Sequence, residues 1–119
     1  MSKRYEDPLP ISRAKVQTAL RSPDDRVTAL ALIRMGLHEK DWKWAEGICL
    51  SALSDYRKSV RTASLTALGH LARIHRKLHL EIVVPAVRKL MDDPDCSGVA
   101  EHTLEDINMF VSRTVSQSI

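Results

Sequence analysis

The sequence predicts an all-α protein, and three observations support that prediction. Glycine and proline are scarce in the 119-residue chain, with four and five residues, and the aromatic residues make up only 4% of it. Residues that favour helices, such as alanine and leucine, are instead plentiful. Apolar residues recur with helical spacing in six segments, and turn-forming motifs separate these segments at nearly even intervals. The length fits one domain with a single ordinary core.

The turn motifs define where each helix is expected. Helices are predicted after the motifs DPLP, RSPDD, HEKD, SDYRK, KLHL and DDPDCSG, the first over residues 11–20 and the last over residues 99–112. Aspartate and serine before an apolar stretch are typical of helix N-caps. The six helices fall into three pairs, at about residues 11–37, 42–76 and 80–113. We expect these pairs to form one domain that spans residues 1–119.

The second helices of the three pairs can be aligned with one another. Val27, Val60 and Val99 take equivalent places, and each follows a turn that contains aspartate. The apolar residues that follow at five and eight positions also match: Leu32, Leu65 and Leu104, then Met35, Leu68 and Ile107. A helical hairpin that repeats after 33 and then 39 residues is typical of a stacked α-solenoid.

The middle unit resembles the second helix of a HEAT repeat. That pattern has an aspartate in the turn, then Val-Arg, an alanine and finally Ala-Leu-Gly. It is matched here by Asp55, Val60, Arg61, Ala63, Ala67, Leu68 and Gly69. The resemblance covers roughly residues 11–112, and the outer two units match only loosely. It implies a short HEAT-like α-solenoid of three stacked hairpins, with the second helices on the concave side. A tetratricopeptide array is the alternative fold.

Charge, cysteines and hydropathy restrict the class of protein. Residues 56–80 contain six arginines and lysines and no acid, whereas residues 81–107 contain seven acids and two basic residues. No apolar run approaches the roughly 18 residues of a membrane span, and the first ten residues lack the apolar segment of a signal peptide. We therefore expect a cytoplasmic protein. Cys49 and Cys96 have no second pair with which to form a zinc site, so both are expected to be free thiols.

The candidate chemical residues favour structural roles. His75 and His79 are one helical turn apart, but no cysteine or carboxylate clusters near them, so no metal is expected. Asp55 and Arg61 could bind phosphate, but the HEAT resemblance implies that they form contacts between neighbouring repeats. No nucleophile and base stand together, so we expect neither enzymatic activity nor a cofactor.

The stripe opposite the apolar face of the second helices is the main candidate for binding a partner. It comprises Thr62, Thr66, Gly69, Arg73 and Lys77 in the middle unit and Glu101, Glu105, Asn108 and Ser112 in the last. Gly69 lies about 180° from Val60 around the helix, so we expect it to be exposed there, although a small residue could also mark a helix crossing. Mixed charge favours a charged protein surface over a phosphate backbone. A merely solvated face is the alternative.

Trp42 and Trp44 are a second candidate contact. They lie two residues apart, so they cannot both point to the same side of a helix. One is expected to be at least half-exposed, where tryptophan often anchors a protein partner. The alternative is that one tryptophan covers the end of the hairpin.

The function predicted from these features is protein binding without catalysis. The most specific hypothesis is a bacterial immunity protein that binds and neutralises a toxin in a contact-dependent inhibition system, and it rests on analogy at the level of the fold. The alternatives are a nucleic-acid-binding HEAT-like protein, which would use the basic segment 56–80, and an adaptor subunit of a larger complex. Only one helix pair is basic, and the aromatic residues are too sparse for a base-stacking surface.

Overall fold

The computed structural model describes residues 8–111, which form six α-helices and one short 3-10 helix and contain no strand. The all-α prediction is confirmed. The helices are α1 (Arg13–Leu20), α2 (Asp25–His38), α3 (Trp42–Ala52), α4 (Lys58–His75), α5 (Leu80–Lys89) and α6 (Ser97–Phe110), and the 3-10 helix η1 (Leu90–Asp92) precedes the last turn. No helix in this part of the chain combines the length and apolar content that are needed to cross a membrane.

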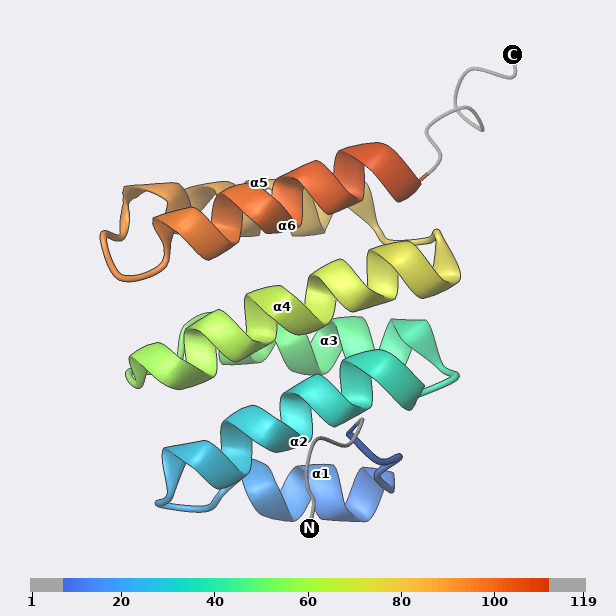
Figure 1. Ribbon diagram of the computed structural model, residues 1–119, viewed down its shortest axis with the longest axis vertical. Coiled ribbons are helices and arrows are strands. Elements are labelled where there is room, and N and C mark those ends of the chain that lie inside the picture. Colours follow the sequence, from blue (N-terminus) through green and yellow to red (C-terminus); the bar gives the residue numbers. More distant parts are fainter. Residues whose placement is uncertain (1–7, 112–119) are drawn as a thin grey trace, which may run out of the picture.

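The helices form three antiparallel pairs that lie one above another along the longest axis of the molecule (Figure 1). The second helices α2, α4 and α6 run in the same direction and form one layer, and α3 and α5 lie behind it. Packing between the pairs is concentrated in the layer of second helices, where α4 contacts both α2 and α6. The turns within the three pairs consequently lie along one edge of the molecule.

Three of the helices begin with the side-chain caps that the turn motifs indicate. Ser12 accepts a hydrogen bond from the amide of Lys15, Asp24 from Arg26, and Asp41 from Trp44, at 3.0–3.2 Å. Such caps satisfy amide groups that a helix start otherwise leaves without partners. Helix α4 begins differently, because Asp55 accepts a bond from the amide of Arg57 in the preceding turn.

Helix α4 is the centre of the hydrophobic core. It contacts α2 on one side, α6 on the other and α3 behind, so apolar residues around most of its circumference are buried. Val60, Leu65, Leu68 and Leu71 have no exposed surface. They meet Leu32 and Met35 of α2, Ile107 of α6 and the valines of α5 in one continuous cluster.

The contact of α2 with α4 and the contact of α4 with α6 are made at equivalent positions of the repeat. A Cβ added to Gly36 would lie 2.8 Å from the Cα of Ala67, and one added to Gly69 would lie 2.9 Å from a carboxylate oxygen of Asp106. Gly36 and Gly69 are 33 residues apart, and Ala67 and Asp106 are 39 apart, which are the spacings of the sequence repeat. Equivalent residues therefore meet at both joints.

The structure corrects the expectation that Gly69 is exposed. Gly69 is buried where α4 meets α6. Its position opposite Val60 on the helix did not indicate exposure, because other helices cover α4 on three sides. Val27 also differs from its counterpart, since it is 46% exposed while Val60 is fully buried. Helix α2 belongs to the first pair among the described residues, so no preceding pair of residues 8–111 covers this side of it.

Candidate partner-binding surface

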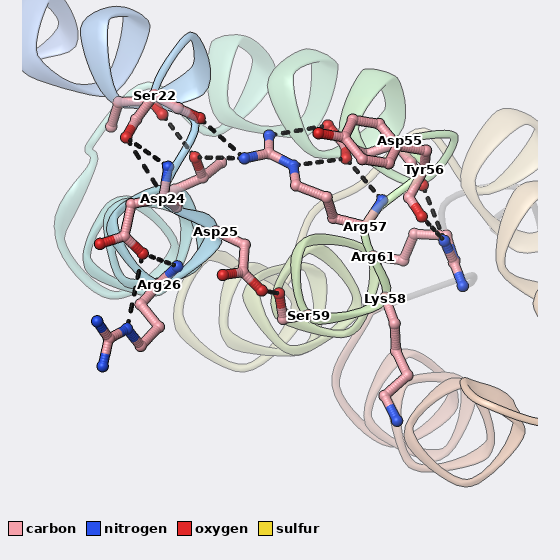
Figure 2. Close-up of polar contacts among 12 residues, drawn as sticks. Ser22, Asp24, Asp25, Arg26, Asp55, Tyr56, Arg57, Lys58, Ser59 and Arg61 are labelled. Carbon is pink, nitrogen blue, oxygen red and sulfur yellow. Dashed lines mark hydrogen bonds and ion pairs between the residues drawn. The ribbon is translucent and has the colours of Figure 1, made fainter.

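The turns within the three pairs lie along one edge of the molecule, and this edge carries a network of hydrogen bonds and ion pairs centred on Arg57 (Figure 2). The guanidinium of Arg57 donates to both carboxylate oxygens of Asp55, at 3.0 and 3.2 Å. The same group reaches the first pair, where Nη1 donates to the backbone oxygen of Ser22 at 2.9 Å and to the hydroxyl of Thr28 at 3.3 Å. Arg57 thus joins the middle pair to the first. The HEAT-like pattern did not identify this residue as a link.

Arg61 makes the corresponding link to the third pair. Its Nη1 donates to the backbone oxygens of Asp55 and Tyr56, each at 3.0 Å. Its Nε lies 3.3 Å from a carboxylate oxygen of Asp93 in the turn before α6. Its guanidinium also faces the buried thiol of Cys96, and burial raises the pKa of that thiol. Arg61 therefore connects the turns of two neighbouring pairs.

Asp55 and Arg61 accordingly have structural roles: Arg61 links the second pair to the third, and Asp55 pairs with Arg57, which links the second pair to the first. The hydrogen bond from Arg57 holds the pKa of Asp55 below its usual range, because it favours the charged carboxylate. Both arginines of the network have raised pKa values, with Asp55 as the main cause for Arg57 and the Cys96 contact for Arg61. These side chains are only slightly exposed and are already paired, so a phosphate group would have to displace their partners.

The predicted stripe on α4 is only partly a surface. Thr62 and Thr66 are half-buried, and the hydroxyl of Thr62 donates to backbone oxygens of its own helix at 3.1 and 3.2 Å. Arg73 is exposed on the last turn. Lys77 is exposed, but it does not continue the stripe, because α4 ends at His75 and Arg76 adopts a left-handed conformation with φ of 58°. The prediction that Lys77 belongs to the stripe on this helix is therefore wrong.

A cluster that the sequence analysis missed lies beside Gly69. The guanidinium of Arg73 contacts Nδ1 of His70, and the carboxylate of Asp106 reaches the same region from α6. Burial and then the charge of Arg73 lower the pKa of His70, whereas Asp106 acts in the opposite direction. The repeat could have indicated this cluster. Asp106 takes the position that Ala67 has in the preceding unit, and a charged residue in place of a small one is a departure from the pattern.

The acidic half of the predicted stripe lies in a different place from the basic half. Glu101, Glu105 and Asn108 line a groove of about 320 Å³ between α5 and α6, together with Val84, Arg88, Leu104 and Ile107. Thr62, Thr66 and Arg73 do not line it. This groove is on the outer side of the third pair, so the two halves of the stripe do not form one continuous groove. Ser112 lies outside the described residues.

Trp42 and Trp44 point toward different neighbours. The Trp42 ring lies 5.1 Å from the His79 ring at the start of α5, while the guanidinium of Arg13 at the start of α1 lies 4.7 Å from the centre of the Trp44 ring. Both tryptophans are half-buried against the core. Their separation of two residues directs one toward each adjacent pair, so they contribute packing between pairs as well as some exposed aromatic surface.

The histidines that were considered as metal ligands have separate structural partners. His79 bonds to Glu46 twice, through its backbone amide and through Nδ1, each at 2.7 Å. Glu46 is only 4% exposed, and a buried carboxylate of this kind requires such partners. His75 instead places Nε2 3.1 Å from the backbone oxygen of Glu39. Within residues 8–111, no group of three or more potential ligands is arranged to hold a metal ion.

Comparisons with known proteins show a relationship at the level of the fold. No family model matches the chain, and no curated protein matches its sequence. The chain is similar to one chain in the crystal structure of a CDI complex from Cupriavidus taiwanensis LMG 19424, with a TM-score of 0.81 and 28% sequence identity. The match covers 92% of this chain and 96% of that chain. The two chains therefore share their fold over nearly their whole lengths.

Proposed function

We propose that this chain is a non-enzymatic immunity protein that binds a toxin of a contact-dependent inhibition system and neutralises it. The observation that carries the proposal is the similarity to a chain of a CDI complex, which extends over nearly the full length of both chains. A chain in such a complex is either the toxin or the protein that binds it. The HEAT-like classification also stays a proposal, supported by the repeated joint between second helices.

The roles of the polar side chains favour the inhibitor over the toxin. The pair of the buried Glu46 with the half-buried His79 joins α3 to the start of α5, and the Asp55–Arg57 pair joins two turns of the stack. These groups are engaged in holding helices together, whereas catalytic groups must reach a substrate. The arrangement supports a rigid binding surface.

The same contacts weaken the nucleic-acid alternative. The basic segment 56–80 contains Arg57 and Arg61, which already bond to carboxylates or backbone oxygens. A nucleic-acid site requires several cations that are available to phosphate groups. The exposed cations that are left in this segment are distributed over both ends of α4 and the following loop.

We propose that Arg73 on α4 and Glu101 and Glu105 on α6 contact the partner, with Thr62, Thr66, Lys77, Asn108, Trp42 and Trp44 as further candidates. Arg73, Glu101 and Glu105 are exposed. Arg73→Glu should weaken the complex by several kcal/mol if a carboxylate of the partner faces it, because like charges would meet in a partly desolvated contact.

The direct test is coexpression with the protein that the adjacent reading frame encodes. We expect that protein to stop growth when it is expressed alone, and this chain to restore growth. A cell that grows equally poorly with and without this chain would refute the proposed function. The double variant Glu101→Lys/Glu105→Lys adds a second test, because it should weaken a protein complex that uses this surface, whereas a nucleic-acid ligand should bind to it more tightly.

A further inference from the structure

A groove lies between α1 and α2, on the outer side of the first pair. It has a volume of about 460 Å³ and is lined by Ile11, Lys15, Thr18, Ala19, Ser22, Val27, Leu30, Ala31 and Arg34. Val27 is 46% and Leu30 52% exposed. The lining includes two cations and no carboxylate, so the groove combines an apolar floor with positive charge.

The repeat shows what kind of contact this groove is built to make. Val27, Leu30 and Arg34 are each 33 residues before Val60, Ala63 and Ala67. In α4, Val60 and Ala63 are buried, on the side where Ala67 packs against Gly36 of the preceding pair. The exposed floor of the groove is therefore the counterpart of a surface that, one unit later, is covered by a second helix.

The third pair, at the opposite end of the stack, presents the surface that would complete such a contact. Leu104 lines the outer groove between α5 and α6, and it is 39 residues after Leu65, whose backbone oxygen accepts a bond from Thr103 of α6. The side of α4 that receives the next helix thus corresponds to the side of α6 that faces outward. Leu104 stands between Glu101 and Glu105, so an apolar residue there is flanked by negative charge.

The charges of the two ends are also opposite. The stretch Arg13–His38 contains five arginines and lysines and two acids, whereas Leu80–Phe110 contains seven acids and two basic residues. Lys15 and Glu101 are both exposed at the surface. Two copies placed end to end would therefore bring an acidic face against a basic one, which favours their encounter.

We infer that copies of this chain associate head to tail, with the outer face of α6 in one copy packed into the α1/α2 groove of the next. Leu104 would meet Val27 and Leu30, and Glu101 and Glu105 would approach Lys15 and Arg34. Arg34 donates to the backbone oxygens of Leu9 and Pro10 at 2.7 and 2.6 Å, so the segment 8–11 lies at one end of the groove and the incoming helix would occupy the remaining part. Such a contact uses two different faces and can extend beyond two copies.

The test is the mass of the purified chain in solution, without the toxin, by sedimentation equilibrium. The average mass should rise between about 10 µM and 1 mM and should fall again at high salt, because the contact is partly electrostatic. A chain that stays monomeric throughout this range would overturn the inference. This outcome is independent of the growth assay, so either idea can fail alone.

Variants of each face identify the contact. Leu30→Asp blocks the groove and Glu101→Lys/Glu105→Lys blocks the acidic face, and each should weaken association at least about tenfold. Glu81→Lys/Asp92→Lys is the matched control, because it changes the charge equally at exposed residues that line neither groove. Lys15→Glu is the second groove variant if Leu30→Asp does not fold, as judged by circular dichroism.

Mixing the two blocked variants provides the decisive result. Each retains one intact face, so an equimolar mixture should form dimers and no larger species, at concentrations where each variant alone is mostly monomeric. A mixture that stays monomeric would contradict head-to-tail packing. Loss of association by the groove variants alone, with normal association of Glu101→Lys/Glu105→Lys, would show that the groove pairs with its own copy, and would also overturn the inference.

Discussion

Replacing Gly36 by alanine should destabilise the protein, although alanine is the better helix former. The new Cβ would lie 2.8 Å from the Cα and 2.9 Å from the Cβ of Ala67, whereas carbon atoms in contact normally stay about 3.5–4.0 Å apart. The nearest atom belongs to the backbone, so α2 and α4 must separate by several tenths of an ångström. Overpacking of this kind costs about 1–3 kcal/mol, and the helix propensity of alanine offsets about 1 kcal/mol of it.

We therefore expect Gly36→Ala to lower the free energy of unfolding by up to about 2 kcal/mol. Urea unfolding followed by circular dichroism measures this quantity. Gly47→Ala is the matched control, since Gly47 lies in α3 and a Cβ there meets nothing within 4 Å; it should stabilise the protein by up to about 1 kcal/mol. If Gly36→Ala stabilises the protein as much as Gly47→Ala does, the close contact between α2 and α4 is refuted.

Three further predictions concern the joints between the pairs. Gly69→Ala should leave stability unchanged or raise it by up to about 1 kcal/mol, because the atom that its Cβ meets is the end of the Asp106 side chain, which can rotate; a loss comparable to that of Gly36→Ala would contradict this. The folded-state pKa of Asp55 is depressed, so its contribution to stability is complete above the unfolded pKa of about 3.9 and is lost as the pH falls through the folded value. Asp55→Asn should accordingly reduce the difference in unfolding free energy between pH 7 and pH 3, and an unchanged difference would count against the Arg57 pairing. Arg61→Ala should lower the free energy of unfolding by about 1–3 kcal/mol with toxin affinity nearly unchanged, whereas lost binding at normal stability would assign Arg61 to the partner surface.

The sequence was sufficient to predict where the helices lie and how they pair, because both features depend on local patterns. Asp24 and Asp41 each begin a helix as caps, and the spacing of Leu32, Leu65 and Met35 follows the buried side of the second helices. The Asp-Val-Arg pattern also led to the correct structural role for Arg61, because its partner Asp93 belongs to the equivalent turn of the next unit.

The remaining features depend on which helices lie next to one another in space. Gly69 is buried because α6 covers it, and no pattern within α4 contains that information. Lys77 was placed on α4 because its spacing from Arg73 suits a helix, whereas the chain turns at Arg76 with a positive φ. The acidic residues of α6 line a groove with α5, and a comparison of helical positions with α4 alone could not reveal this.

The central claim, that this chain acts by binding a toxin, is tested most directly by titrating the purified chain with the protein that the adjacent reading frame encodes. Isothermal titration calorimetry should give a stoichiometry of one to one and a dissociation constant in the nanomolar range, about −12 kcal/mol, as neutralisation by occupancy requires. Arg73→Glu should weaken that binding while the melting temperature is retained. The absence of heat at micromolar concentrations, together with salt-sensitive binding of the chain to nucleic acid, would contradict the account.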